Sequence, residues 1–374
     1  MQRELEPLIR QDLDRKIVLL TGPRQCGKTT LSRVMSSQYE YFNWDSSEDR
    51  LVLQKKKWNR NTELVILDEL HKMKKWKSWL KGIYDTEGGR PRLLVTGSAK
   101  FDTYKKMGDS LAGRFFQFRL HPFTLRELRH ELPAEEACEK LLACGGFPEP
   151  FLAQDESYYK RWRRSHLDII LRQDMLDLES IRDIQSIETL VELLRYRVGS
   201  PVSYSSLARD LQRDPKTVKH WLQVLENLYV IFRVSPYHKN AGRVLLKEPK
   251  YYFFDNAQVL GDPGARLENL VATSLKRDLE FLEDTTGTQV QLYYARSTDG
   301  KEIDFMVVIE QKPSWLIEVK LGSDEPNKAF QHFAQFWPEA KQVQLVHKLK
   351  REFSIPNGPE IKHLAPWLQN SPIF

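Results

Sequence analysis

A glycine-rich segment near the N-terminus constrains the fold more than any other part of the chain. The segment TGPRQCGKTTL, residues 21–31, places two glycines five positions apart and follows the second with lysine and threonine. An apolar run at 16–20 precedes it and predicts a buried strand. Residues 28–37 predict a helix with apolar positions at Leu31, Val34 and Met35. Strand, glycine loop and helix in this order predict a phosphate-binding loop.

The loop predicts a role for each of its polar residues. Backbone N–H groups would surround the phosphates of ATP. Lys28 would reach the β- and γ-phosphates, and the Thr29 hydroxyl would ligate Mg²⁺. The alternative is a chance loop before a helix. The predicted nucleotide contacts are Gly22, Pro23, Arg24, Gln25, Cys26, Gly27, Lys28, Thr29 and Thr30.

Two further apolar runs end in polar residues that suit hydrolysis. Residues 63–69 read as a buried strand ending in Asp68 and Glu69. Asp68 fits the carboxylate on the Mg²⁺ side, and Glu69 fits the group that polarises the attacking water. A third strand, 92–100, carries Ser98 near its end, where a polar side chain can sense the γ-phosphate. A serine that only caps a turn is the alternative.

These motifs resemble a widespread bacterial and archaeal family of AAA-type ATPases. That family has a GPRQxGKTTL loop, an LDE strand, TGS, LAGR, a GGFPEP turn, a winged helix and a C-terminal domain of unknown function. The counterparts in this chain are residues 22–31, 67–69, 96–98, 111–114 and 145–150. The resemblance implies that Arg114 stabilises charge on the transferred phosphate, whereas a surface or packing arginine is the alternative. Cys26 departs from the small aliphatic residue common in relatives and could make the site sensitive to thiol reagents.

The middle of the chain predicts helices across residues 121–195, including 124–132. The resemblance implies that this segment is a helical lid. Residues 158–174 mix aromatic and basic side chains, which suits either a nucleic-acid surface or a buried stripe with a basic outer face. The helical spacing favours the buried stripe, formed by Tyr159, Trp162, His166 and Ile169/Ile170.

Residues 201–237 predict a winged helix-turn-helix. A short helix is followed by a second helix with Asp214 as its N-cap and Pro215 in its first turn. A strand comes next. The outward face of the second helix would contact DNA through Arg213, Lys216 and Lys219. A module that only packs between domains is the alternative.

The C-terminal part predicts a helix, three strands, a helix and a strand, with a hairpin turn at Asp299-Gly300. Strand alternation lets Asp304 and Glu318 meet across paired strands with Lys320 alongside, and such carboxylates suit a divalent cation. This pattern resembles the PD-(D/E)XK nuclease core, which implies a further metal-site acid at Glu268. A salt-bridge cluster and an inactive nuclease fold are the two alternatives.

The predicted fold class is α/β, with an AAA-type P-loop ATPase core at 1–120, a helical lid at 121–195, a winged helix at 196–240 and a nuclease-like domain at 241–374. The net charge of +6 suits a polyanionic partner. The chain has no long apolar run and only three cysteines, so we expect a cytoplasmic protein without a membrane anchor. We expect an ATPase that acts on branched or broken DNA, with a homo-oligomer as its candidate assembly. A nucleotide-switched signalling ATPase and an ATP-gated nuclease are the alternatives.

Overall fold

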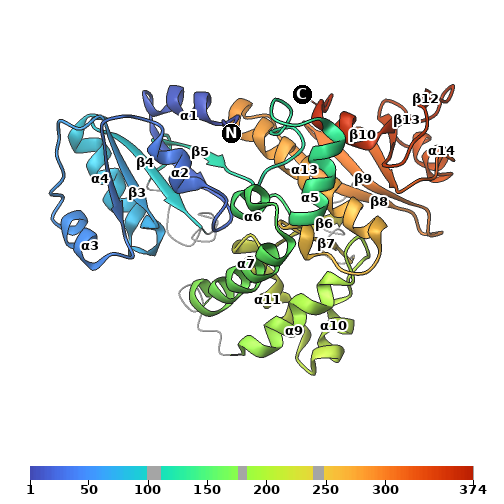
Figure 1. The fold of residues 1–374 in the computed structure, drawn as a ribbon, viewed down its shortest axis with the longest axis horizontal. Helices are drawn as coiled ribbons and strands as arrows, with labels where there is room; N and C mark the ends of the chain where they lie inside the picture. The colour runs from blue at the N-terminus through green and yellow to red at the C-terminus, as the bar shows by residue number, and fades with distance from the viewer. Residues whose placement is uncertain (99–110, 176–182, 239–247, 374) are drawn as a thin grey trace. The chain divides into compact units, whose positions relative to one another are not determined.

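The computed structural model describes residues 1–98, 111–175, 183–238 and 248–373 (Figure 1). Its internal contacts divide the chain into two compact units. The N-terminal unit comprises Met1–Pro122 with Asn227–Tyr229, and the C-terminal unit comprises Phe123–Glu226 with Val230–Phe374. The domain boundaries expected inside the C-terminal unit remain predictions.

The N-terminal unit is built on a five-stranded sheet in the order β2-β3-β4-β1-β5. Every pairing in it is parallel. Its strands are β1 Ile17–Thr21, β2 Tyr39–Asn43, β3 Leu64–Asp68, β4 Arg92–Gly97 and β5 Phe115–Arg119. The order places β4 between β1 and β3, so the ends of these three strands lie side by side. Strands β1 and β3 are buried along their whole length, as expected for a parallel sheet covered on both faces.

The helices of this unit are α1 Glu6–Leu13, α2 Lys28–Arg33, α3 Ser47–Gln54, the short η1 Leu70–Lys72 and α4 Trp76–Glu87. Helix α2 is shorter than the sequence predicts. Of the predicted apolar positions, Leu31 and Met35 are buried, whereas Val34 is 48% exposed. The Arg10 side chain donates to the carbonyls of Val34 and Met35, which satisfies the chain just beyond the last helical turn.

The first part of the C-terminal unit is helical. Residues 124–132 form turns rather than the predicted helix. Pro133 follows directly and disfavours helical geometry at the residue before it, which keeps this short segment from propagating. The helices are α5 Ala134–Cys144, α6 Pro148–Ala153, α7 Glu156–Ile169, the π-helix η3 Ile170–Asp174 and α9 Ile184–Arg195.

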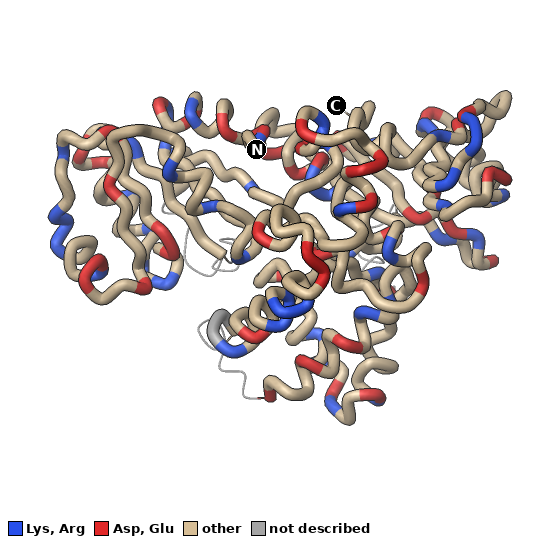
Figure 2. Tube along the Cα trace, viewed as in Figure 1, with Lys and Arg blue, Asp and Glu red and all other residues tan. Residues whose placement is uncertain are grey.

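The aromatic stripe predicted on α7 is confirmed. Tyr159, Trp162 and His166 are all buried, and the Trp162 and His166 rings stack with centroids 4.5 Å apart. The basic residues of α7 lie on other faces of the helix, where Figure 2 shows a group of positive positions. The apolar spacing therefore separated core from surface correctly.

Two helices joined by a short turn follow, namely α10 Tyr204–Leu211 and α11 Pro215–Asn227. The predicted cap is confirmed, since the Lys216 N–H donates to Asp214 Oδ1 over 2.8 Å. Strand β6 Ile231–Pro236 comes next and pairs antiparallel with β7 Lys250–Phe253.

Strands β6 and β7 belong to an eight-stranded sheet in the order β12-β13-β11-β10-β9-β8-β6-β7. The remaining strands are β8 Val290–Arg296, β9 Glu302–Ile309, β10 Lys312–Lys320, β11 Lys341–Val346, β12 Phe353–Ser354 and β13 Glu360–His363. The helices are η4 Asn256–Gln258, α13 Pro263–Thr286, α14 Ala329–Ala334 and α15 Leu364–Gln369. Helix α13 packs against β7, β8 and β10 (Figure 1). The predicted succession of helix, three strands, helix and strand is thus confirmed, and β12, β13 and α15 extend it.

No helix in the described parts of the chain has the length and apolar character needed to cross a membrane.

Candidate nucleotide site and a buried ion cluster

The glycine loop joins β1 to α2 in a conformation that its sequence makes possible. A Cβ at Gly22 would lie 2.1 Å from the carbonyl oxygen of Leu120, so no larger residue fits there. Gln25 and Gly27 have φ angles of 62° and 99°, in the left-handed region. The predicted contacts Gly22 to Gly27 form the loop itself, and Lys28, Thr29 and Thr30 form the first turn of α2.

Lys28 points back over the loop. Its Nζ donates to the carbonyls of Gly22 at 2.9 Å and Pro23 at 2.7 Å. The side chain is buried, and no carboxylate of the described residues forms an ion pair with it. The Lys28 charge acts on the Glu69 carboxylate without forming an ion pair with it, and a buried ammonium in that position favours an anionic ligand.

Asp68, at the end of β3, accepts hydrogen bonds from three hydroxyl groups. Its Oδ2 accepts hydrogen bonds from Thr29 Oγ1 at 3.1 Å and from the Tyr41 hydroxyl at 2.5 Å. Its Oδ1 accepts from the Thr96 hydroxyl on β4. The structure therefore brings together the two residues that the sequence assigns to Mg²⁺, Thr29 and Asp68. Tyr41 was not predicted, because nothing in β2 marks it apart from other strand residues. Thr96 belongs to the TGS motif, but Ser98 was chosen from that motif as the functional side chain.

Glu69 lies at the start of the turn after β3, with φ of 54°. Its Oε2 accepts a hydrogen bond from Ser98 Oγ at 3.1 Å and lies 3.5 Å from His71 Nδ1. Burial raises the pKa of Glu69, although the Lys28 ammonium opposes that shift. Burial lowers the pKa of His71 to about 4, so this imidazole is neutral at pH 7. A carboxylate with a raised pKa is suited to accept a proton from water.

Arg114 forms an ion pair with Asp85 on the surface of the N-terminal unit. Its Nε lies 2.7 Å from Asp85 Oδ1, and a second guanidinium nitrogen lies 3.2 Å from Asp85 Oδ2. This bidentate pair joins the start of β5 to α4. Both partners are partly exposed, so the pair can open to other ligands at little cost.

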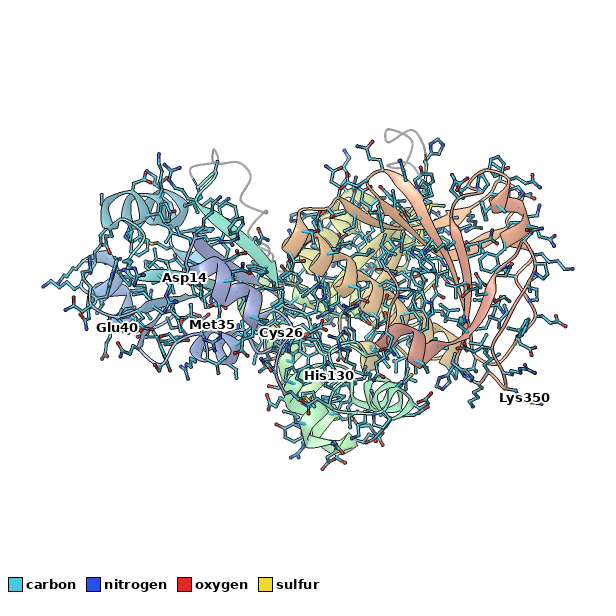
Figure 3. All side chains as sticks on the ribbon, turned by 90° about the horizontal axis from the view of Figure 1, so that it is seen from above. Asp14, Cys26, Met35, Glu40, His130 and Lys350 are labelled. Atoms are coloured by element: carbon cyan, nitrogen blue, oxygen red, sulfur yellow. The ribbon has the colours of Figure 1, made fainter. Side chains whose placement is uncertain are left out.

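Cys26, labelled in Figure 3, is fully buried in the loop, and its Sγ approaches the Leu120 carbonyl at 3.4 Å. Burial protects this thiol from reagents, contrary to the expected sensitivity.

The residues predicted to contact DNA are exposed, with Arg213 in the turn before α11 and Lys216 and Lys219 near the start of that helix. Arg213 pairs with Asp183 at 2.8 Å. Lys216 and Lys219 border a groove of about 270 Å³ that Arg233 also lines. Besides these cations, Glu226 lines the groove, as do Tyr204 and Tyr251, whose hydroxyls lie 3.2 Å apart.

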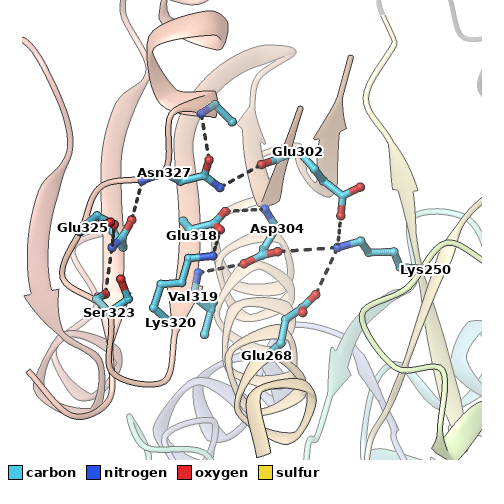
Figure 4. Close-up of polar contacts among 12 residues, drawn as sticks. Lys250, Glu268, Glu302, Asp304, Glu318, Val319, Lys320, Ser323, Glu325 and Asn327 are labelled. Atoms are coloured by element: carbon cyan, nitrogen blue, oxygen red, sulfur yellow. Dashed lines mark hydrogen bonds and ion pairs between the residues drawn. The ribbon is translucent and has the colours of Figure 1, made fainter. Parts of the chain in front are cut away.

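The second predicted site lies where β9, β10 and α13 meet (Figure 4). The Val319 N–H donates to Asp304 Oδ2 at 2.9 Å, and the Asp304 N–H lies 3.4 Å from Glu318 Oε2. Lys320 Nζ donates to Glu318 Oε1 at 2.6 Å. Asp304, Glu318 and Lys320 therefore meet as the strand alternation predicts.

A lysine that the sequence analysis missed lies among these acids. Lys250, on β7, is 1% exposed. Its Nζ lies 2.8 Å from Glu302 Oε1, 3.3 Å from Glu268 Oε1 and 3.8 Å from Asp304 Oδ1 (Figure 4). Lys250 is the first residue of a short strand. The sequence alone therefore does not distinguish it from an ordinary lysine at a strand end. We call Lys250, Glu268, Glu302, Asp304, Glu318 and Lys320 the ion cluster.

The charges of the ion cluster depend on one another. Burial disfavours the charge of Lys250, yet Glu268, Asp304 and Glu302 raise its pKa overall. Burial, Glu268 and Glu318 hold the pKa of Asp304 well above its ordinary value. Among the residues that the structure describes, no three histidine, cysteine or acidic side chains are grouped so as to hold a metal ion.

Three family models match consecutive parts of the chain. Residues 14–129 match an AAA domain. Residues 135–260 match a domain of unknown function, DUF8612, and residues 263–366 match another, DUF4143. These matches support an AAA-type ATPase family. Its ATPase-like part coincides with the parallel sheet of the N-terminal unit, and nucleotide binding is the property that this part implies.

Similar proteins occur in distant microorganisms. An uncharacterized protein of Mycobacterium tuberculosis is 27% identical over 323 residues, which cover 83% of this chain and 72% of the relative. An uncharacterized protein of Haemophilus influenzae is 22% identical, with 94% of each chain covered. One from Methanocaldococcus jannaschii is 24% identical, covering 84% of this chain and 76% of the relative. Chains that are similar over most of this length therefore occur in bacteria and in an archaeon.

Proposed function

We propose that the chain binds and hydrolyses ATP and uses that cycle to act on DNA. The observation that carries the first part is the buried Lys28 ammonium, which lies on loop carbonyls beside Asp68 and Glu69 without an ion-pair partner among the described residues. Phosphate oxygens would supply the missing negative charge.

The residues around the loop divide the work of hydrolysis. Lys28 and the loop N–H groups would hold the phosphates. Thr29 and Asp68 would hold Mg²⁺, which when bound neutralises charge on the phosphates. Glu69 would orient water and accept its proton. Ser98, directly after β4, donates a hydrogen bond to the Glu69 carboxylate. A contact between Ser98 and the γ-phosphate would therefore affect the group that orients water.

Two variants separate binding from hydrolysis. Lys28→Ala removes the ammonium and should weaken ATP binding and abolish turnover. Glu69→Gln keeps the shape but cannot accept a proton, so ATP should bind and persist while turnover falls on the order of 100-fold. Binding is measured with a fluorescent ATP analogue and turnover by phosphate release. Normal turnover in a folded Lys28→Ala protein would exclude the ATPase assignment.

DNA is proposed as the substrate because of the exposed cations at the start of α11. Lys216 and Lys219 border the groove described above, and both belong to the helix that the winged-helix prediction places against DNA. Their contacts would be to phosphates, which position a protein on DNA without selecting a sequence.

The DNA proposal is tested by Lys216→Ala combined with Lys219→Ala. The double variant should bind duplex DNA more weakly, and the salt dependence of binding should flatten by about one unit of slope for each phosphate that is no longer bound. Lys348→Ala with Lys350→Ala removes the same charge from two other exposed lysines and is the matched control. Equal effects of both pairs would indicate a general charge effect. If DNA changes neither the ATP affinity nor the ATPase rate of the wild type, the chain is better explained as a nucleotide switch for a protein partner.

A further inference from the structure

We propose that Lys250 is the resident cation of the ion cluster, and that its ammonium takes the position which the nuclease resemblance assigns to a divalent metal. This inference concerns the C-terminal unit and is independent of the proposed ATPase function.

The Lys250 ammonium lies among the carboxylates of the ion cluster. Nζ of Lys250 contacts carboxylates from α13 and from two positions of β9, namely Glu268, Glu302 and Asp304. A divalent ion bound to these acids would need oxygens at about 2.0–2.6 Å. An ion at that distance from the three carboxylates would lie against Nζ, and two cations in contact repel strongly in a buried site.

Several carboxylate oxygens of the ion cluster also accept from other protein donors. Glu268 Oε1 also accepts from the Tyr252 hydroxyl at 2.6 Å. Asp304 Oδ2 accepts from the Val319 N–H. Glu318 accepts from Lys320. A metal would therefore have to displace protein donors as well as the lysine, so the residues present do not fit a resident metal.

Lys250 cannot leave easily. Its stem is enclosed at the edge of the eight-stranded sheet, Nζ lies 5.3 Å from the centre of the Tyr294 ring, and β7 is fully buried. Gly199 packs against the Glu268 carboxylate, because a Cβ there would lie 2.5 Å from Glu268 Oε2. Moving the ammonium outward would strip a buried charge of three partners, which is costly.

The ion cluster also joins two parts of the chain. Lys250 belongs to the segment that matches DUF8612, while Glu268, Glu302 and Asp304 belong to the segment that matches DUF4143. The role of these acids is therefore to hold β7 to β9 and α13 through Lys250, rather than to hold a catalytic metal.

The first test is a Mn²⁺ titration of the full chain without nucleotide, read by the electron paramagnetic resonance signal of free Mn²⁺. Wild type and Asp304→Asn should give the same stoichiometry, since any Mn²⁺ bound elsewhere, such as at Asp68, is common to both. A wild-type Mn²⁺ site that Asp304→Asn removes would overturn the proposal.

The second test removes the lysine. Lys250→Met should lower the unfolding temperature, and millimolar Mn²⁺ should restore part of it because the acids then accept the ion. Lys250→Met with Glu302→Gln and Asp304→Asn is the matched control. It should be more stable than Lys250→Met and indifferent to Mn²⁺, since Glu268 is then the only charged group left of the three carboxylates that contact Nζ. An unfolded Lys250→Met chain that the neutral triple variant rescues also supports the proposal. Unchanged stability of Lys250→Met would overturn it.

Discussion

Asp255 is a buried carboxylate of the C-terminal unit with a defined set of neighbours. It accepts a hydrogen bond from the Tyr159 hydroxyl at 2.9 Å and from the Ala257 N–H at 3.2 Å. Burial raises the pKa of Asp255 from 3.8 to about 6, against the effect of those hydrogen bonds. The folded chain therefore holds a proton on this residue that the unfolded chain releases at lower pH.

This difference predicts a pH dependence of stability. Because the folded pKa is the higher one, the contribution is fully present below about pH 4 and is lost as pH rises to about 6, on the order of 3 kcal/mol in total. Asp255→Asn keeps the hydrogen-bond acceptor but cannot titrate. Urea unfolding at several pH values should show that this variant lacks the decline between pH 4 and 6. Parallel curves for the two proteins would contradict the assignment.

The residues of the candidate nucleotide site were predictable where a sequence motif sets their spacing. The loop residues and Asp68, Glu69 and Ser98 follow from spacing alone, and the structure places them together. Lys250 and Tyr41 were not predictable, because each is brought to its carboxylates by strand pairing between distant segments.

At the scale of elements, the two glycines that end α5 have a packing reason. Gly145 has φ of 69°, and a Cβ there would lie 2.1 Å from Asp255 Oδ1. A Cβ at Gly146 would lie 2.3 Å from the Phe123 carbonyl oxygen. The turn therefore brings backbone against a buried carboxylate and a neighbouring segment of the chain, with no room for a side chain.

Gly287 offers a comparison for Gly145, because it ends α13 with φ of 75° and nothing lies within 4 Å of the position that a Cβ would take there. Gly287→Ala should cost about 1 kcal/mol from backbone strain. Gly145→Ala should cost roughly 1–3 kcal/mol more, since Asp255 must move and since Gly145, with ψ of −174°, has a conformation that side chains tolerate less well. Urea unfolding of both variants measures the difference. Equal losses would mean that the turn relaxes freely.

Element prediction succeeded where apolar periodicity or a cap was strong, as in α7, α11 and α13. It failed in residues 124–132, where helical spacing is present but a proline ends the segment too early. It also overextended α2, since Val34 continues the apolar pattern while its side chain faces solvent. Periodicity reports which residues are apolar, and it does not report where the tertiary structure stops a helix.

For the whole molecule, Arg114 raises the question of assembly. If it stabilises phosphate charge on a neighbouring subunit, Arg114→Ala should lower turnover on the order of 100-fold with little change in ATP affinity. Mixing Arg114→Ala with Lys28→Ala protein should then recover part of the activity, because some sites receive both residues. Asp85→Asn, which frees Arg114 from its ion pair, should retain activity and serves as the control. No recovery in a confirmed mixed assembly would place the arginine within one chain or in a packing role.

The pairing of β6 with both β7 and β8 determines how the chain can be dissected. A fragment that starts at residue 241 keeps β7 but loses the strand between β7 and β8, so it would carry an open sheet edge and a Lys250 detached from its acids. We expect such a fragment to aggregate, whereas a fragment that begins at Phe123 should be recoverable as a folded piece. The smallest portable part of the C-terminal half is therefore larger than its sequence motifs suggest, and any gene fusion that borrows the strands from β7 onward must borrow β6 with them.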